Sequence, residues 1–118
     1  MKYVDGYVLP VPKKSLKAYI RMAKLGEQMW RKCGALDYKE CVGDDLDSKW
    51  GTPFTKMMKL KPDETVVFSY IVFKSRAHRD SVNAKVMKEM KKLGEMPEMP
   101  FDVKRMVYGG FKAAVETK

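Results

Sequence analysis

The most apolar stretch of the chain runs from residue 66 to residue 73 and reads VVFSYIVF. Seven of its eight residues are β-branched or aromatic, and none is charged. It is too short for a helix of its own, and its composition favours a strand, which we place at residues 64–73. Because polar and apolar residues do not alternate along it, we expect this strand to be buried on both faces.

Two longer segments show the helical period. Apolar residues recur at steps of three and four through residues 13–33, and Gly34 follows as a stop signal. Residues 75–93 predict a second helix, with Ser75 as its N-cap and Gly94 after its end. The first helix should bury one stripe and expose a polar face made of Lys17, Arg21, Lys24 and Gln28.

Three shorter segments complete the predicted sheet. Residues 3–11 form a first strand that Pro10 and Pro12 end. Residues 35–42 form a half-polar strand typical of a sheet edge, and residues 103–111 form the last strand. The remaining segments are read as two loops, 43–53 and 95–102, and as one or two helical turns, 54–60.

The elements follow the order β-α-β-β-α-β in a single domain over residues 1–118, which is the ferredoxin-like sandwich of the α+β class. Two helices cover one face of its antiparallel sheet and leave the other face open. We assign to the open face a set of apolar side chains drawn from Tyr3, Tyr7, Leu9, Phe68, Tyr70 and their neighbours. Covering them contributes roughly 10–20 kcal/mol, against about 4–15 kcal/mol for association. The sequence therefore predicts a homodimer that packs sheet on sheet.

Composition agrees with a soluble globular protein, since 45% of the residues are hydrophobic and 33% are charged. The chain has no run of about 18 apolar residues, the length needed to span a membrane. The N-terminal residues lack the apolar region of a signal peptide. Cys33 and Cys41 lie eight positions apart, without a metal-binding or redox spacing. We therefore expect two free thiols and a cytoplasmic protein.

The net charge of +9 is concentrated in two segments. Residues 13–32 carry seven basic side chains and one acid, and residues 74–92 carry seven basic side chains and two acids. Both segments fall on predicted helices, so a basic helical face could bind an acidic partner such as RNA. Nucleic-acid binding is the weaker reading, because the aromatic residues of the sheet that would stack on bases are used by the dimer.

Asp5 is the most interesting single residue, because the alternation of the first strand points it into the space between the two sheets. A carboxylate there is costly unless it is paired, and its pKa should rise. It could be a general base or ligand anchor, or it could form a structural ion pair with Arg105 of the last strand. In a catalytic reading Asp5 is the base, with Arg105, Tyr70 and His78 as supporting residues. The competing readings are core packing for Tyr70 and a surface or packing position for His78.

No motif predicts a cofactor or a metal. The acidic loop after Gly43 resembles a calcium loop, but Trp50 occupies the position of its required Gly, and Lys56 that of its bidentate Glu. Gly109 and Gly110 lack the third glycine and the following helix of a nucleotide-binding loop. We interpret these two glycines as permitting a bulge or close packing.

Several blocks of the sequence are similar to those of a known family. They are MKYVDGYV (1–8), GAL (34–36), ECVGDD (40–45), VVFSY (66–70), SRAHRD (75–80), MPFD (99–102) and KRMVYGGF (104–111). On these blocks, which run over nearly the whole chain, the protein resembles the YbaA-like family of small bacterial proteins of unknown function. The resemblance implies a dimeric α/β barrel and brings no established reaction. Two departures, Val103 in place of Gly and Glu89-Met90-Lys91 in place of Asp-Pro-Arg, concern loop geometry rather than fold.

Two hypotheses on function follow. In the first, the protein is a small homodimeric ligand binder with a pocket for a small organic molecule between sheet and helices. By analogy with other dimeric α/β barrels it could be a cofactor-free enzyme. In the second, it is a non-enzymatic binding module that holds an acidic partner on its basic helical face. The first hypothesis calls for neither a metal nor a nucleotide cofactor.

Overall fold

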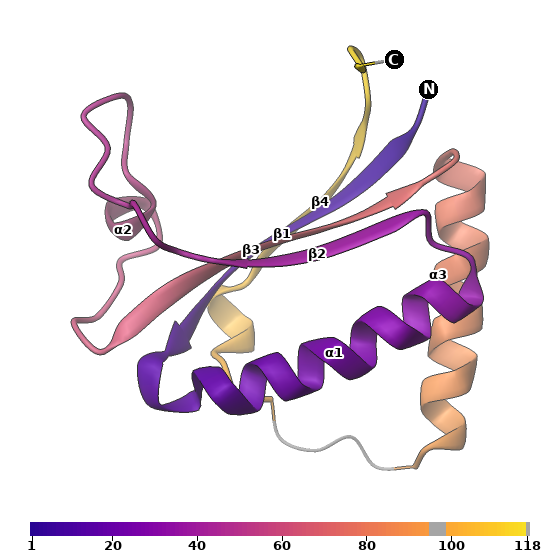
Figure 1. The fold of residues 1–118 in the computed structure, drawn as a ribbon, viewed down its shortest axis with the longest axis horizontal. Helices are drawn as coiled ribbons and strands as arrows, with labels where there is room; N and C mark the ends of the chain where they lie inside the picture. The colour runs from indigo at the N-terminus through magenta and orange to yellow at the C-terminus, as the bar shows by residue number, and fades with distance from the viewer. Residues whose placement is uncertain (95–98, 118) are drawn as a thin grey trace.

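The computed structural model describes residues 1–94 and 99–117. Its centre is a four-stranded antiparallel sheet of β1 (Tyr3–Pro12), β2 (Asp37–Val42), β3 (Glu64–Phe73) and β4 (Val107–Lys112). The two long helices, α1 (Leu16–Cys33) and α3 (Arg76–Lys92), lie on one side of this sheet, and the two chain ends lie close together (Figure 1). The predicted α+β class is therefore confirmed.

Most element boundaries follow the local sequence signals. β3 spans the predicted residues, and a short 3-10 turn at Lys13–Ser15 leads into α1. Gly34 ends α1 with a φ of +117°, a left-handed conformation that favours glycine. Ser75 caps α3 as predicted, because its side chain accepts a hydrogen bond from the backbone N–H of His78 at 3.1 Å.

The largest difference from the predicted elements lies before the last strand. Residues 103–105, predicted as strand, form a 3-10 turn because the Asp102 carboxylate accepts a hydrogen bond from the backbone N–H of Lys104 at 3.1 Å. β4 consequently begins at Val107. The helical turns predicted at 54–60 are the short α2 (Phe54–Met57). Of the loop predicted at 95–102, residues 95–98 lie outside the described part of the chain.

The strand order is β2-β3-β1-β4. β1 lies in the middle and pairs with β3 on one side and β4 on the other. The half-polar β2 forms one edge of the sheet, as its sequence predicted. In this register Asp5 faces Gly110 across the β1–β4 pair and Ile71 across the β1–β3 pair.

The two faces of β1 are the reverse of our sequence-based assignment. Tyr3 and Leu9 belong to buried clusters that include helix residues, so Tyr3, Asp5, Tyr7 and Leu9 face the helices. The prediction that this set lies on the open face was wrong. Alternation divides a strand into two sets of side chains, but it does not state which set the helices cover. The larger set faces the helices because it fills the layer between them and the sheet.

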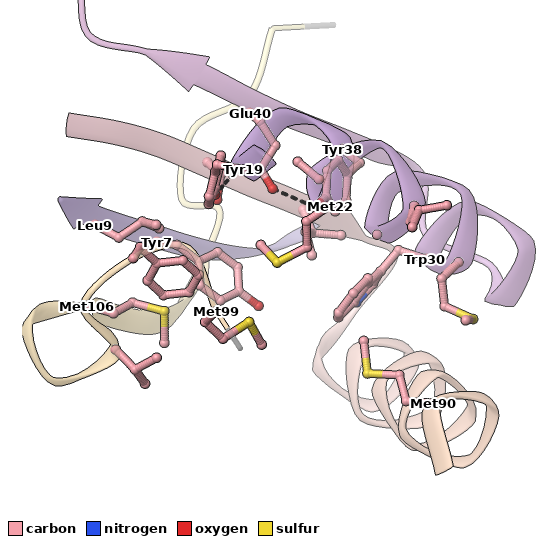
Figure 2. Close-up of a pocket in the computed structure, with 18 of the residues that line it drawn as sticks. Tyr7, Leu9, Tyr19, Met22, Trp30, Tyr38, Glu40, Met90, Met99 and Met106 are labelled. Carbon is pink, nitrogen blue, oxygen red and sulfur yellow. Dashed lines mark hydrogen bonds between the residues drawn. The ribbon is translucent and has the colours of Figure 1, made fainter. Parts of the chain in front are cut away.

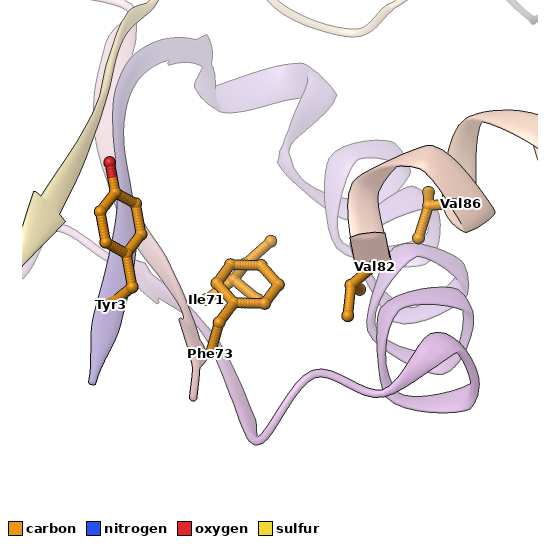
Figure 3. Packing of buried hydrophobic residues seen from close by; sticks show 5 residues of the cluster. All are labelled: Tyr3, Ile71, Phe73, Val82 and Val86. Carbon is orange, nitrogen blue, oxygen red and sulfur yellow. The ribbon is translucent and has the colours of Figure 1, made fainter. Parts of the chain in front are cut away.

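The apolar core consists of two clusters. Beneath α3, Ile71 and Phe73 of β3 pack against Val82 and Val86, with Tyr3 alongside (Figure 3). The second cluster lies beneath α1 and consists of Leu9, Val11, Tyr19, Ala23 and Val67. Full burial of such side chains contributes ~1.5–3 kcal/mol each, so each helix is held to the sheet mainly through its own cluster.

The face of the sheet away from α1 and α3 stays partly open within one chain. Phe68 is 44% exposed on β3, while Val107 and Phe111 of β4 are 54% and 62% exposed. Tyr70 and Val72 on the same face of β3 are half-buried. A single chain therefore covers the apolar strand fully on its helix face and only partly on the other.

Candidate functional site

A cavity of about 390 Å³ lies between the two apolar clusters. Its walls come from β1, β2, β3, α1, α3 and the segment before β4, and Figure 2 shows the side chains that surround it. Five of the described lining residues are methionines: Met22, Met29, Met90, Met99 and Met106. The volume falls within the range of small-molecule sites, roughly 300–1,000 Å³. Flexible methionine side chains suit a site that adapts to the shape of a ligand.

One carboxylate stands out in this mainly apolar wall. Glu40 accepts a hydrogen bond from the hydroxyl of Tyr19 at 2.6 Å on one oxygen and from the hydroxyl of Tyr38 at 2.6 Å on the other (Figure 2). Both distances are typical of charge-assisted O–H to carboxylate bonds. Tyr38 and Glu40 lie two residues apart on β2 and so share a face, whereas Tyr19 comes from α1. The three side chains therefore join the edge strand to the helix.

The two tyrosines can act only as donors to Glu40 at neutral pH. Burial raises the pKa of both hydroxyls above its ordinary value, and the hydrogen bond and negative charge of Glu40 raise it further. Each phenol therefore keeps its proton.

Gly26 makes room for this arrangement in the middle of α1. A Cβ atom at this position would lie 3.0 Å from the hydroxyl oxygen of Tyr38. Glycine is otherwise unfavourable inside a helix, by roughly 1 kcal/mol relative to alanine. Its presence here allows the Tyr38 hydroxyl to lie against the helix backbone.

Asp5 lies outside the cavity lining and is fully buried under α3. Its carboxylate accepts hydrogen bonds from Arg79 Nη1 at 2.9 Å and from Asn83 Nδ2 at 3.4 Å. Arg79 also donates to the hydroxyl of Tyr108 at 2.8 Å and stacks over the ring of Tyr3 at 4.9 Å. Burial raises the pKa of Asp5, and the attraction of Arg79 offsets only part of that effect.

The ion pair expected between Asp5 and Arg105 is not the one that forms. Arg105 Nη1 binds both oxygens of Glu64, at 3.0 and 2.8 Å, and its Nη2 donates to the carbonyls of Met58 and Lys59. Glu64 lies opposite Pro12 in the β1–β3 register, and Pro12 is seven positions along β1 from Asp5. At the rise of a strand, seven positions span roughly 23 Å. Arg105 thus binds both β3 and the segment that connects β2 to β3 (residues 43–63). Its hydrogen bonds lower the pKa of Glu64.

The structure does not bring the remaining predicted site residues together with Asp5. Tyr70 lies on the open face of the sheet, where the Lys39 ammonium sits 5.8 Å from its ring centre. His78 lies at the start of α3, where its Nδ1 accepts a hydrogen bond from the backbone N–H of Lys74 at 3.0 Å and its ring meets the edge of Phe73. A single catalytic group of Asp5, Arg105, Tyr70 and His78 therefore has no geometric basis.

The residues that define the cavity around Glu40 could not be identified from the sequence. Glu40 and Tyr38 read as ordinary members of a half-polar edge strand, while Tyr19 and Gly26 read as members of an apolar helical stripe. The available signal was a glycine inside that stripe together with a tyrosine and a glutamate on one face of a strand. Their meeting depends on the position of α1 over β2.

Helix α1 carries basic side chains on its exposed face. Lys17, Arg21 and Lys24 are exposed on α1, and the binding of an acidic partner there stays a prediction.

Within residues 1–94 and 99–117, no group of three or more His, Cys, Asp or Glu side chains is placed to hold a metal ion. None of the described helices has the length and apolar composition to cross a membrane.

The raised pKa of Asp5 predicts a specific pH dependence of stability. Between the ordinary value of 3.8 and the raised native pKa, the folded protein binds more protons than the unfolded chain, so the free energy of unfolding falls as the pH rises. Relative to Asp5→Asn, which does not titrate, the wild type should lose stability as the pH rises above 3.8. Urea denaturation of both proteins across this pH range measures the difference.

The matched control is Asp80→Asn, which removes an exposed carboxylate bound to the same guanidinium at 2.8 Å. A stability difference between wild type and Asp5→Asn that moved the other way, in favour of the wild type at higher pH, would contradict this account. It would mean that the attraction of Arg79 exceeds the effect of burial.

Comparisons with known proteins agree with the resemblance seen in the sequence. Residues 2–103 match the family described as Protein of unknown function (DUF1428). The uncharacterized protein YbaA of Escherichia coli K12 and that of Shigella flexneri are each 42% identical over 118 residues, covering 98% of this chain and 99% of YbaA. Among solved structures, the de novo designed protein Foldit4 aligns with 96% of this chain and 99% of its own at 10% identity and a TM-score of 0.47. The chain therefore belongs to the DUF1428 family of proteins of unknown function.

Proposed function

We propose that this protein binds a small, mainly apolar organic molecule in the cavity between α1, α3 and the sheet. The observation that carries the proposal is a cavity of about 390 Å³ whose described lining is apolar apart from one carboxylate held by two tyrosine hydroxyls. Apolar walls with a few fixed polar groups are typical of small-molecule sites. The cavity opens to solvent, since the lining residues Leu25 and Leu93 are 67% and 73% exposed. A bound apolar ligand would remove part of this apolar surface from water, which is favourable.

We further propose that the protein acts as a cytoplasmic homodimer of ferredoxin-like subunits that forms a dimeric α/β barrel. The strand order β2-β3-β1-β4, with both long helices on one face, supports the ferredoxin-like arrangement. The exposed Phe68, Val107 and Phe111 support packing of the two open sheet faces against each other. Cys33 and Cys41 are free thiols, which suits a reducing compartment.

The cavity proposal is tested with the neutral fluorescent probe N-phenyl-1-naphthylamine. Its emission should rise on binding to the wild type, and Ala23→Phe, which places a ring in the cavity, should weaken that binding by about tenfold or more. The matched control is Ala84→Phe, an exposed position on α3 outside the lining, which should bind the probe like the wild type.

Two results would contradict the cavity proposal. One is a wild type that does not bind the probe, and the other is a well-folded Ala23→Phe that binds it as tightly as Ala84→Phe does. Circular dichroism establishes that each variant is folded, and Met29→Trp provides a second variant that fills the cavity.

The dimer is tested by sedimentation equilibrium at micromolar concentration. The wild type should have twice the mass of one chain, and Phe68→Lys combined with Phe111→Lys should be monomeric, because two charges on the apolar face cannot be buried in the interface. Met87→Lys is the control, since Met87 is 56% exposed but lies on α3. A wild type that sediments as a folded monomer would rule out the proposed homodimer.

A further inference from the structure

The charge inside the cavity is opposite to that of the protein as a whole. The chain has 24 lysines and arginines and a net charge of +9. Among the described residues that line the cavity, Glu40 is the one charged side chain, and none is basic. An anionic ligand would therefore meet a carboxylate and no counter-charge in this site.

Glu40 forms no ion pair within residues 1–94 and 99–117. Within the described chain, no lysine, arginine or histidine nitrogen lies within ion-pair distance of its carboxylate. The two tyrosine hydroxyls stabilise the charge, but they are neutral donors and carry no opposite charge. A carboxylate has about four acceptor positions, so each oxygen can accept a further hydrogen bond from a ligand.

Aromatic rings line the same cavity near this carboxylate. Tyr19 and Tyr38 donate to Glu40, Trp30 lies 6.1 Å from Tyr38 between ring centres, and Phe101 meets Tyr19 edge to face at 5.8 Å. The face of an aromatic ring carries partial negative charge and attracts a cation. A positively charged group close to Glu40 would therefore be favoured by the carboxylate and by the rings together.

We propose that the ligand of this cavity is a hydrophobic organic cation, an amine or ammonium compound. Its charged nitrogen binds at Glu40 among Tyr19, Tyr38 and Trp30, and its apolar part lies among the methionines. This inference rests on the proposed binding function of the cavity and adds the charge of the ligand to it. Such a ligand would supply a counter-ion to Glu40, which forms no ion pair among the described residues.

Three probes of one shape and different charge test the inference: 4-phenylbutylamine, 4-phenylbutanol and 4-phenylbutyrate. In isothermal titration calorimetry at neutral pH, the amine should bind the wild type about tenfold more tightly than the alcohol, and the carboxylate should bind weakest. Glu40→Gln should remove the preference for the amine over the alcohol while the alcohol still binds. Glu89→Gln, which makes the same charge change on α3 outside the cavity lining, should keep the preference.

The outcomes separate this inference from the proposed function. If the alcohol binds the wild type as tightly as the amine, or if Glu40→Gln keeps the preference, the cation inference is wrong while the cavity still binds apolar molecules. If none of the three probes binds, and N-phenyl-1-naphthylamine does not bind either, both proposals fail. The ranking of the three probes on the wild type requires no variant, so it decides the question even if Glu40→Gln does not fold.

Discussion

The hydrogen bond from Tyr19 to Glu40 joins α1 to the edge strand β2, and Tyr38, which also lies on β2, donates to the other oxygen of Glu40. Gly26 allows the Tyr38 hydroxyl to reach the helix without displacing it. Since the two apolar clusters lie beneath α1 and α3, the space between them remains as a cavity.

Two carboxylates face the helices and are treated in opposite ways. Asp5 is fully buried and receives a guanidinium, so its charge is balanced inside the protein. Glu40 receives neutral hydroxyls and lies in the cavity wall. The indole of Trp30, another wall residue, donates to Asn83 at 3.0 Å, and Asn83 in turn binds Asp5. Asn83 thereby links the Asp5–Arg79 pair to one wall of the cavity, whereas Glu40 has no such cation partner among the described residues.

The order of the elements could be predicted from hydrophobic periodicity because each element is specified by residues close together in the sequence. The strand at residues 64–73, the cap at Ser75 and the helix end at Gly34 each depend on a few neighbouring residues. The face occupied by Asp5 could not be predicted, because alternation divides a strand into two faces without indicating which face the helices cover. Its partner could not be predicted either, since Arg79 and Arg105 are equally plausible until the position of α3 is known. The glutamate–tyrosine group joins two elements and has no motif of its own.

The central claim is that Glu40 and its two tyrosines stand in the wall of an apolar cavity beneath α1. Crystallography under xenon pressure tests this most directly, because xenon binds where apolar side chains leave unfilled space. The account predicts xenon between α1 and the sheet, close to Met22 and Met29, with Glu40 bonded to both tyrosine hydroxyls. A structure without xenon at that position, in which side chains fill this space and Glu40 points into solvent, would contradict it.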